Sequence, residues 1–173
     1  MRNITSSFGR YKQLVDSLRL DRIDLALLAE LQGDGRVSNA DLAERVKLSP
    51  SACLRRVQRL EATGMVAGYA ALLDPTRVGL GLQAFVRVQL ARHDAETIAA
   101  FSLRVNGWDE VVACHALTGD MDYLMHVIVQ DLDHFSRFLL DRLLSGDFVA
   151  DVNSSFVLRS IKQTRRLSLD HLA

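Results

Sequence analysis

SNADLAERVKLSPSACLRRVQRLEATG, residues 38–64, is the stretch that decides how the N-terminal part of this 173-residue chain folds. Ser38 is a predicted N-cap, and Asp41 three residues later gives a short form of the capping box. Ser49 followed by Pro50 predicts a second helix start, because serine can accept from free N–H groups and proline at the first helical position loses no hydrogen bond. The stretch therefore predicts two short helices joined by a tight turn.

The second of these helices separates apolar from polar side chains. Cys53, Leu54, Val57 and Leu60 recur at helical spacing and are expected to be buried, and Gly64 is placed to end the helix. The side chains left outside are Ser51, Ala52, Arg55, Arg56, Gln58 and Arg59. In a helix-turn-helix protein the N-terminal end of this helix points at base edges, and arginine is long enough to reach guanine or phosphate.

Charge is local in this chain. The formal net charge is zero, yet residues 45–59 hold several basic residues and no acidic one, which is the field that phosphate contact requires. A solvated helix face, or a helical hairpin that only packs, is the alternative interpretation. We interpret the stretch as DNA-binding and expect the contacts to come from Ser38, Asn39, Lys47, Ser49, Ser51, Ala52, Arg55, Arg56 and Arg59.

The segment before this stretch supplies a first helix. Apolar residues at helical spacing mark one face of residues 20–31 and end near two glycines; they are Leu20, Ile23, Leu27, Leu28 and Leu31. Residues 20–64 are thus the predicted DNA-binding domain. Residues 1–19 are basic on balance and are predicted to be a flexible or partly helical arm.

The remainder of the chain alternates strand and helix patterns. Residues 65–81 are predicted to form a strand and a linker, and residues 162–173 a C-terminal tail. Between them, strands are predicted at 82–90, 109–117, 121–129 and 149–161, and helices at 97–105 and 132–144. The order β-α-β-β-α-β predicts a ferredoxin-like domain over residues 82–161, with helices on one face of an antiparallel sheet. The whole chain is therefore expected to be α+β.

The turn between the two middle strands carries groups that suit a small zwitterion. Residues 118–123, TGDMDY, offer carboxylates for an α-amino group and glycine-flanked N–H groups for an α-carboxylate. A plain hairpin turn explains the same residues, and the motif alone favours that simpler interpretation.

Catalysis, metal binding and membrane insertion find no support in the pattern. The five histidines are dispersed, Cys53 and Cys114 lack metal or redox spacing, and no nucleophile stands with a base. No apolar run reaches the roughly 18 residues of a membrane span, so we expect a cytoplasmic protein without cofactor.

Taken together, these residues resemble the Lrp/AsnC family of transcriptional regulators, over roughly residues 20–170. The matching pieces are Leu20-Asp-Arg-Ile-Asp24, Gly35-Arg-Val-Ser-Asn39, Leu48-Ser-Pro50, Cys53-Leu-Arg-Arg56, Leu60-Glu61, Gly68-Tyr69, Ala71-Leu-Leu-Asp-Pro75, Cys114-His115, Thr118-Gly-Asp120, Asp122-Tyr-Leu124 and Ser154-Ser-Phe-Val-Leu158. The resemblance implies a winged-type helix-turn-helix domain, an amino-acid effector, and a partner subunit that covers the open sheet face and pairs with the strand at 65–73.

By this resemblance the effector site falls on Thr118, Gly119, Asp120, Asp122 and Tyr123, and extends to His115 and Met121. Relatives often have glycine where this chain has Lys47, and an aromatic residue where it has Met121; a flexible thioether there would favour an apolar effector such as leucine or methionine.

The sequence thus predicts a regulator of genes for amino-acid metabolism or transport. It is expected to bind double-stranded DNA as a homodimer that assembles to a tetramer or octamer, and to be nucleoid-associated. The alternatives are an architectural DNA-binding protein without an effector, or an enzyme built on the ferredoxin-like domain.

Overall fold

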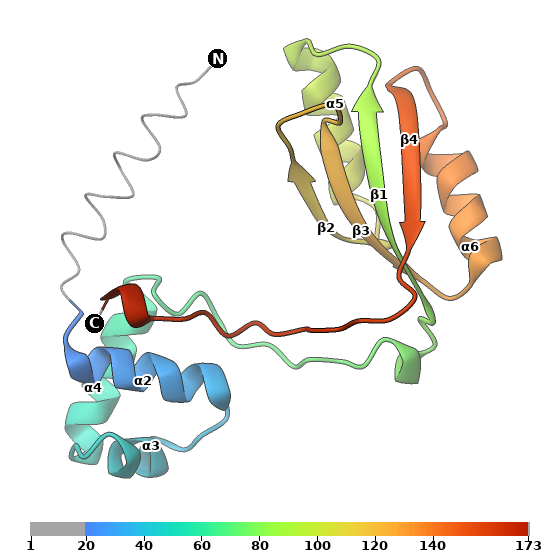
Figure 1. Cartoon of the computed structure of the whole chain (residues 1–173). Helices are drawn as coiled ribbons and strands as arrows, with labels where there is room; N and C mark the ends of the chain where they lie inside the picture. Colours follow the sequence, from blue (N-terminus) through green and yellow to red (C-terminus); the bar gives the residue numbers. More distant parts are fainter. Residues whose placement is uncertain (1–19, 173) are drawn as a thin grey trace. The chain divides into compact units, whose positions relative to one another are not determined.

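The computed structural model describes residues 20–172, and the chain divides into two compact units (Figure 1). One unit comprises Leu72–Lys162, and the other joins the chain up to Ala71 with the segment from Gln163 onward. The chain therefore passes from one unit to the other twice. The predicted arm, residues 1–19, lies outside the described residues.

The first unit, which the sequence predicts to bind DNA, contains three capped helices between residues 20 and 71. These are α2 (Arg22–Gly33), α3 (Asn39–Arg45) and α4 (Pro50–Ala62). Ser38 accepts a hydrogen bond from the N–H of Asp41, and Ser49 accepts one from Ala52, so both predicted caps are confirmed. The buried core residues of the three helices are Leu27, Leu28, Leu42, Ala43, Cys53 and Leu60. These caps place the N-terminal end of α4 at a fixed point on the unit.

Two predictions for this unit are wrong. Leu54 is 46% exposed, because the core lies against Cys53 and Leu60 and position 54 turns about 100° away from position 53 around the helix. Residues 65–73 form no strand and are mostly exposed, since no other strand among residues 20–172 hydrogen-bonds to them.

The second unit has the predicted ferredoxin-like order. Its strands are β1 (Leu82–Leu90), β2 (Val111–Ala116), β3 (Tyr123–Val129) and β4 (Val149–Phe156), and its helices include α5 (Ala95–Asn106) and α6 (Leu132–Arg137). The sheet order is β2-β3-β1-β4, with every neighbouring pair antiparallel. Alternate residues of β1 and β3 pack with Phe101 of α5 and Phe135 of α6, which leaves the other sheet face without helices.

Two elements of this unit differ from prediction. β4 ends at Phe156 rather than near 161, because its pairing with β1 ends there and Leu158 beyond it is 99% exposed. Helix α6 continues as a π-helix, Phe138–Leu143, in which the N–H of Leu144 donates to the carbonyl of Leu139 at 2.9 Å. Short 3-10 turns complete the chain at Thr76–Val78 and Asp170–Leu172. Among residues 20–172, no helix is long and apolar enough to cross a membrane.

Candidate functional sites

The start of α4 is fixed by polar side chains that the sequence assigned to DNA contact. Ser49 caps the helix and lies 3.3 Å from the hydroxyl of Ser51, and both side chains are exposed. The amide of Asn39 donates to the carbonyl of Pro50 at 2.9 Å, which ties the start of α3 to the start of α4. Asn39, which is half-buried, thus links the two helices across the turn.

Two of the three predicted arginines of α4 are held by carboxylates at the start of α2, those of the N-cap Asp21 and of Asp24. Arg56 donates to Asp24 at 2.8 Å and to Asp21 at 2.7 Å, and Arg59 also pairs with Asp24. The Asp24 side chain is only 1% exposed, and it additionally accepts from the N–H of Asp21 in a reciprocal capping box. Arg56 and Arg59 thus fasten α4 to α2.

Electrostatics agree with this geometry. The N–H of Asp24 and the guanidinium of Arg56 hold the pKa of Asp21 below its ordinary value. The same pairing, with Asp21 first and Asp24 second, raises the pKa of Arg56. These partners lie more than 30 positions away from the arginines along the chain, so spacing within either helix does not reveal them.

The basic residues that remain outward are fewer than the sequence suggested. Arg45 pairs with Glu30 at 3.0 Å. Arg55 and Lys47 are exposed and make no ion pair with any residue in the described part of the chain. Lys47 has a φ of 56°, the left-handed region, at the turn between α3 and α4. Together with Ser51, these two side chains form the exposed basic surface around the start of α4.

The predicted effector loop lies between β2 and β3. The N–H of Leu117 donates to the carbonyl of Asp122 at 2.8 Å and closes the loop, and Gly119 adopts a φ of 124° that favours glycine. Thr118, Gly119 and Asp120 are exposed on it, as is His115 on β2. These residues present an N–H-rich turn and a carboxylate to solvent.

Asp122 has a different position from Asp120. Its carboxylate accepts from the N–H of Leu90 at 2.7 Å and lies 2.8 Å from Nε2 of His93, so it ties the loop to the end of β1. Burial alone would raise the pKa of Asp122, but the hydrogen bonds from Leu90 and His93 lower it below its ordinary value. Asp122 therefore shapes the loop as a carboxylate that is already paired.

The last two predicted effector residues face inward. Met121 is buried at 8% exposure, and the ring of Tyr123 lies 4.7 Å from that of Phe101. A cavity of about 170 Å³ lies beside Tyr123; it is lined by Phe101, Ser102, Val105, Asn106, Cys114 and Tyr123. The loop thus divides into an exposed part at 118–120 and a part at 121–123 that packs on the domain.

Known proteins match both units. A profile described as the Lrp/AsnC ligand binding domain matches residues 83–167, and one described as a winged helix-turn-helix DNA-binding domain matches residues 20–67. The leucine-responsive regulatory protein of Escherichia coli K12 is 41% identical over 148 residues, which cover 86% of this chain and 90% of that protein. The chain belongs to the Lrp/AsnC family.

Solved structures of Lrp/AsnC proteins share the fold. A transcriptional regulator from Neisseria meningitidis, solved as a complex with L-methionine, has a TM-score of 0.86 and 50% identity, covering 89% of this chain and 99% of that one. An AsnC family transcriptional regulator from Agrobacterium tumefaciens has a TM-score of 0.83 and 36% identity over 89% of this chain and 100% of that one. As an Lrp/AsnC member, this chain is a DNA-binding transcriptional regulator with an amino-acid-binding domain, and not an enzyme.

Proposed function

We propose that this Lrp/AsnC regulator binds an operator through the exposed start of α4 and responds to an apolar amino acid, with methionine the first candidate. It would control genes of amino-acid metabolism or transport. The observation that carries the proposal is the 50% identity to the regulator solved with L-methionine, over nearly the whole of both chains. Two copies, paired through the open sheet face and assembling further to a tetramer or octamer in the nucleoid, would supply two α4 helices to one pseudo-palindromic site.

The residues predicted to contact DNA would have two different roles, direct contact with DNA and positioning of α4. Lys47, Ser51 and Arg55 are exposed and would meet phosphates and base edges, with Ser38, Ser49 and Ala52 beside them. Asn39 and Arg56 would act by holding α4 in place, because their polar groups are already bonded within the unit. Arg59, paired with Asp24 yet 50% exposed, would contribute to both.

An operator titration at several salt concentrations tests this division. Arg55→Ala should weaken binding and lower the salt slope by about 1, as loss of one phosphate contact does, while leaving thermal stability unchanged. Arg56→Ala, the matched control one position along, should lower thermal stability as well as affinity. Unchanged affinity and slope in Arg55→Ala would remove α4 from the DNA interface.

For the effector, the exposed carboxylate of Asp120 and the N–H groups around Gly119 would hold the amino acid, with Thr118 and His115 beside them. Met121, Asp122 and Tyr123 would set the shape of the loop behind it, since their side chains are packed or paired.

Calorimetry against the twenty amino acids tests the effector site. Methionine should give the tightest binding, and Asp120→Ala should weaken it strongly. Asp147→Ala, which removes another exposed carboxylate of the same unit, should leave binding unchanged. If no amino acid binds, the protein is an effector-independent organiser of DNA and the regulatory part of the proposal is wrong.

A further inference from the structure

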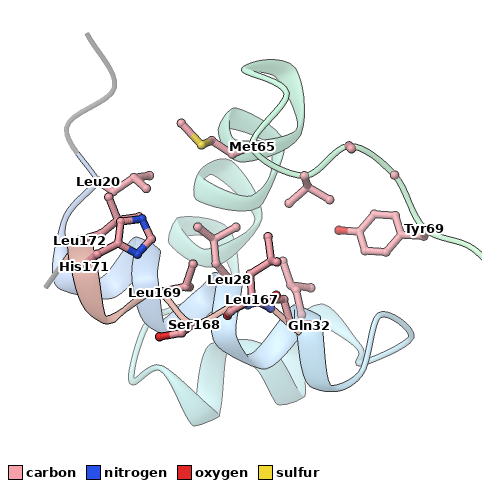
Figure 2. A pocket seen from close by; sticks show the side chains of 14 residues that line it. Leu20, Leu28, Gln32, Met65, Tyr69, Leu167, Ser168, Leu169, His171 and Leu172 are labelled. Atoms are coloured by element: carbon pink, nitrogen blue, oxygen red, sulfur yellow. Dashed lines mark hydrogen bonds between the residues drawn. The ribbon is translucent and has the colours of Figure 1, made fainter. Parts of the chain in front are cut away.

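The C-terminal segment, residues 163–172, is part of the DNA-binding unit and lies on α2 (Figure 2). The side-chain amide of Gln32 bonds to both main-chain groups of Leu167: it accepts from the N–H at 2.6 Å and donates to the carbonyl at 3.2 Å. Two residues further on, Leu169 packs against the core of the helices. Gln32 thus binds the backbone of this segment as a neighbouring strand would.

Residues 163–172 are only weakly buried where they contact α2; we call this contact the seat of the segment. The Leu167 side chain is 74% exposed, and Leu169 is only partly buried. An apolar cavity of about 420 Å³ lies beneath, lined by residues that include Leu28, Leu31, Met65, Tyr69, Leu169 and Leu172. Figure 2 shows side chains from α2, from the segment after α4 and from the C-terminal segment around this space. Contacts that are few, exposed and incompletely packed belong to the low-stability end of a structure and open locally.

Because the chain crosses between the two units twice, the contact of residues 163–172 with α2 affects how the units are connected. The DNA-binding unit is joined to the second unit at Ala71 and Leu72, and again at Lys162 and Gln163, close after β4. While the segment is seated, both connections constrain the DNA-binding unit; when it is released, only the first does. Residues 168–172 fall outside both family profiles, which end at 67 and 167.

We propose that residues 163–172 act as a strap, held by Gln32 and Leu169, whose seating couples the DNA-binding unit to the effector-binding domain. A seated strap pre-organises the DNA-binding unit and strengthens operator binding, and its release loosens the unit and weakens the influence of the effector. The strap is a two-state element that both sites can bias, which is what coupling between separate sites requires. This inference rests on the proposed DNA and effector binding for its functional readout.

Full-length variants that release the strap test the proposal. Leu167→Pro removes the N–H that donates a hydrogen bond to the side-chain oxygen of Gln32. Leu167→Ala changes an exposed side chain and keeps that N–H, so it is the matched control. Gln32→Ala removes the same bonds from the α2 side with a residue that favours helix. Hydrogen exchange of residues 168–172 should be about tenfold faster in Leu167→Pro and Gln32→Ala than in Leu167→Ala, the ratio for a seat weakened by one to two hydrogen bonds.

The functional arm uses an operator titration with and without methionine. Both releasing variants should bind the operator about fivefold or more weakly than Leu167→Ala and should show a smaller methionine-dependent shift, in the usual range of coupling between sites. Unchanged exchange, or faster exchange with unchanged affinity and methionine response, overturns the strap. If the wild-type protein and Leu167→Ala bind neither operator nor methionine, it is the proposed function that fails, and the strap's regulatory role falls with it.

Discussion

Lys47 has a backbone conformation that favours glycine, while its side-chain charge suits the proposed contact with DNA. Its φ of 56° places a side chain in the left-handed region that glycine adopts without steric cost, at the turn before α4. The same side chain is exposed and unpaired among the described residues, next to the proposed DNA surface. A lysine here therefore costs stability in the turn while supplying a charge where phosphate would lie.

Lys47→Gly should separate these two effects. We expect the free energy of unfolding of the DNA-binding unit to rise by about 0.5–1 kcal/mol as the left-handed strain is relieved, less the entropy that glycine adds to the unfolded chain. Operator affinity should fall, with a salt slope smaller by about 1. Urea denaturation followed by circular dichroism and a salt-dependent titration measure the two. A Lys47→Asn control tolerates the same backbone without the charge, and a less stable Lys47→Gly would contradict the strain argument.

Asp24 is the residue on which the position of α4 depends. Its buried carboxylate accepts from Arg56, Arg59 and the N–H of Asp21. Asp24→Asn should lower the free energy of unfolding of this unit by about 2–3 kcal/mol, the range for charge-assisted hydrogen bonds to a buried group. Asp21→Asn, at a side chain that is 50% exposed, should cost distinctly less. Denaturation curves compare the two, and equal losses would show that burial of Asp24 is unimportant.

For individual residues, the sequence predicted helix N-caps correctly but did not indicate the ion-pair partners of the arginines. Ser38 and Ser49 were predictable because a cap is a local relation over three residues. The bonds of Arg56 to Asp21 and Asp24 span more than 30 positions, so helical periodicity could place Arg56 off the apolar stripe but could not show what it faces.

Among the elements, the loop between β2 and β3 is tied to the end of β1 by the carboxylate of Asp122. The pKa of Asp122 is lowered in the folded state, so its ionised form stabilises the fold above the unfolded pKa, about 3.9. This contribution is lost as pH falls through the lower folded value. Wild-type protein should therefore lose more stability between about pH 5 and pH 3 than Asp122→Asn does.

Fluorescence can follow this loss in the correct unit. The chain has one tryptophan, Trp108, which meets Phe138 edge-on at 5.5 Å in the core of the second unit. Denaturation curves at each pH, read from Trp108, report the domain that carries Asp122. Parallel pH profiles for wild type and Asp122→Asn would mean that the bonds to Leu90 and His93 do not stabilise the loop.

Element boundaries were predictable where the pattern is internal to the element. The alternation in β1 puts Ala84, Val86, Val88 and Leu90 on the buried face of the sheet and Phe85 on the other, so the predicted strand at 82–90 has the bounds that its own pattern indicates. The composition of residues 65–73 suits a strand, yet strand formation also needs a hydrogen-bonded partner strand, and residues 20–172 provide none for them. The hydrogen bonds between Gln32 and Leu167 join residues that are 135 positions apart in the sequence. No hydrophobic periodicity in residues 163–172 indicates this contact.

For the whole molecule, the sheet face without helices is the surface that we expect to join two copies. Phe85 lies on it, 41% exposed, with its ring stacked on that of His126 at 4.7 Å. Phe85→Glu should weaken self-association, because an unpaired charge would be buried if this face pairs. Light scattering at several concentrations measures the change. Leu103→Glu on α5, at a side chain that is 76% exposed, is the control; dissociation by Leu103→Glu alone would move the interface to the helices.

The α+β class, the order of the elements and the division into two units were predictable from the sequence, because each domain has a complete set of apolar faces. The share of the C-terminal segment in the DNA-binding unit was not, since ten residues with two or three anchoring contacts carry too little pattern to be recognised.

The π-helix after α6 bears on how this chain can change length during evolution. A π turn holds more residues than an α turn, and here it leaves Phe138 and Leu143, five positions apart, both buried. Removing one exposed residue between them, such as Leu140, would bring the spacing to four, which an ordinary α-helix accommodates with both side chains still inward. This helix is therefore a place where a single-codon deletion can be absorbed without redesigning the core around it.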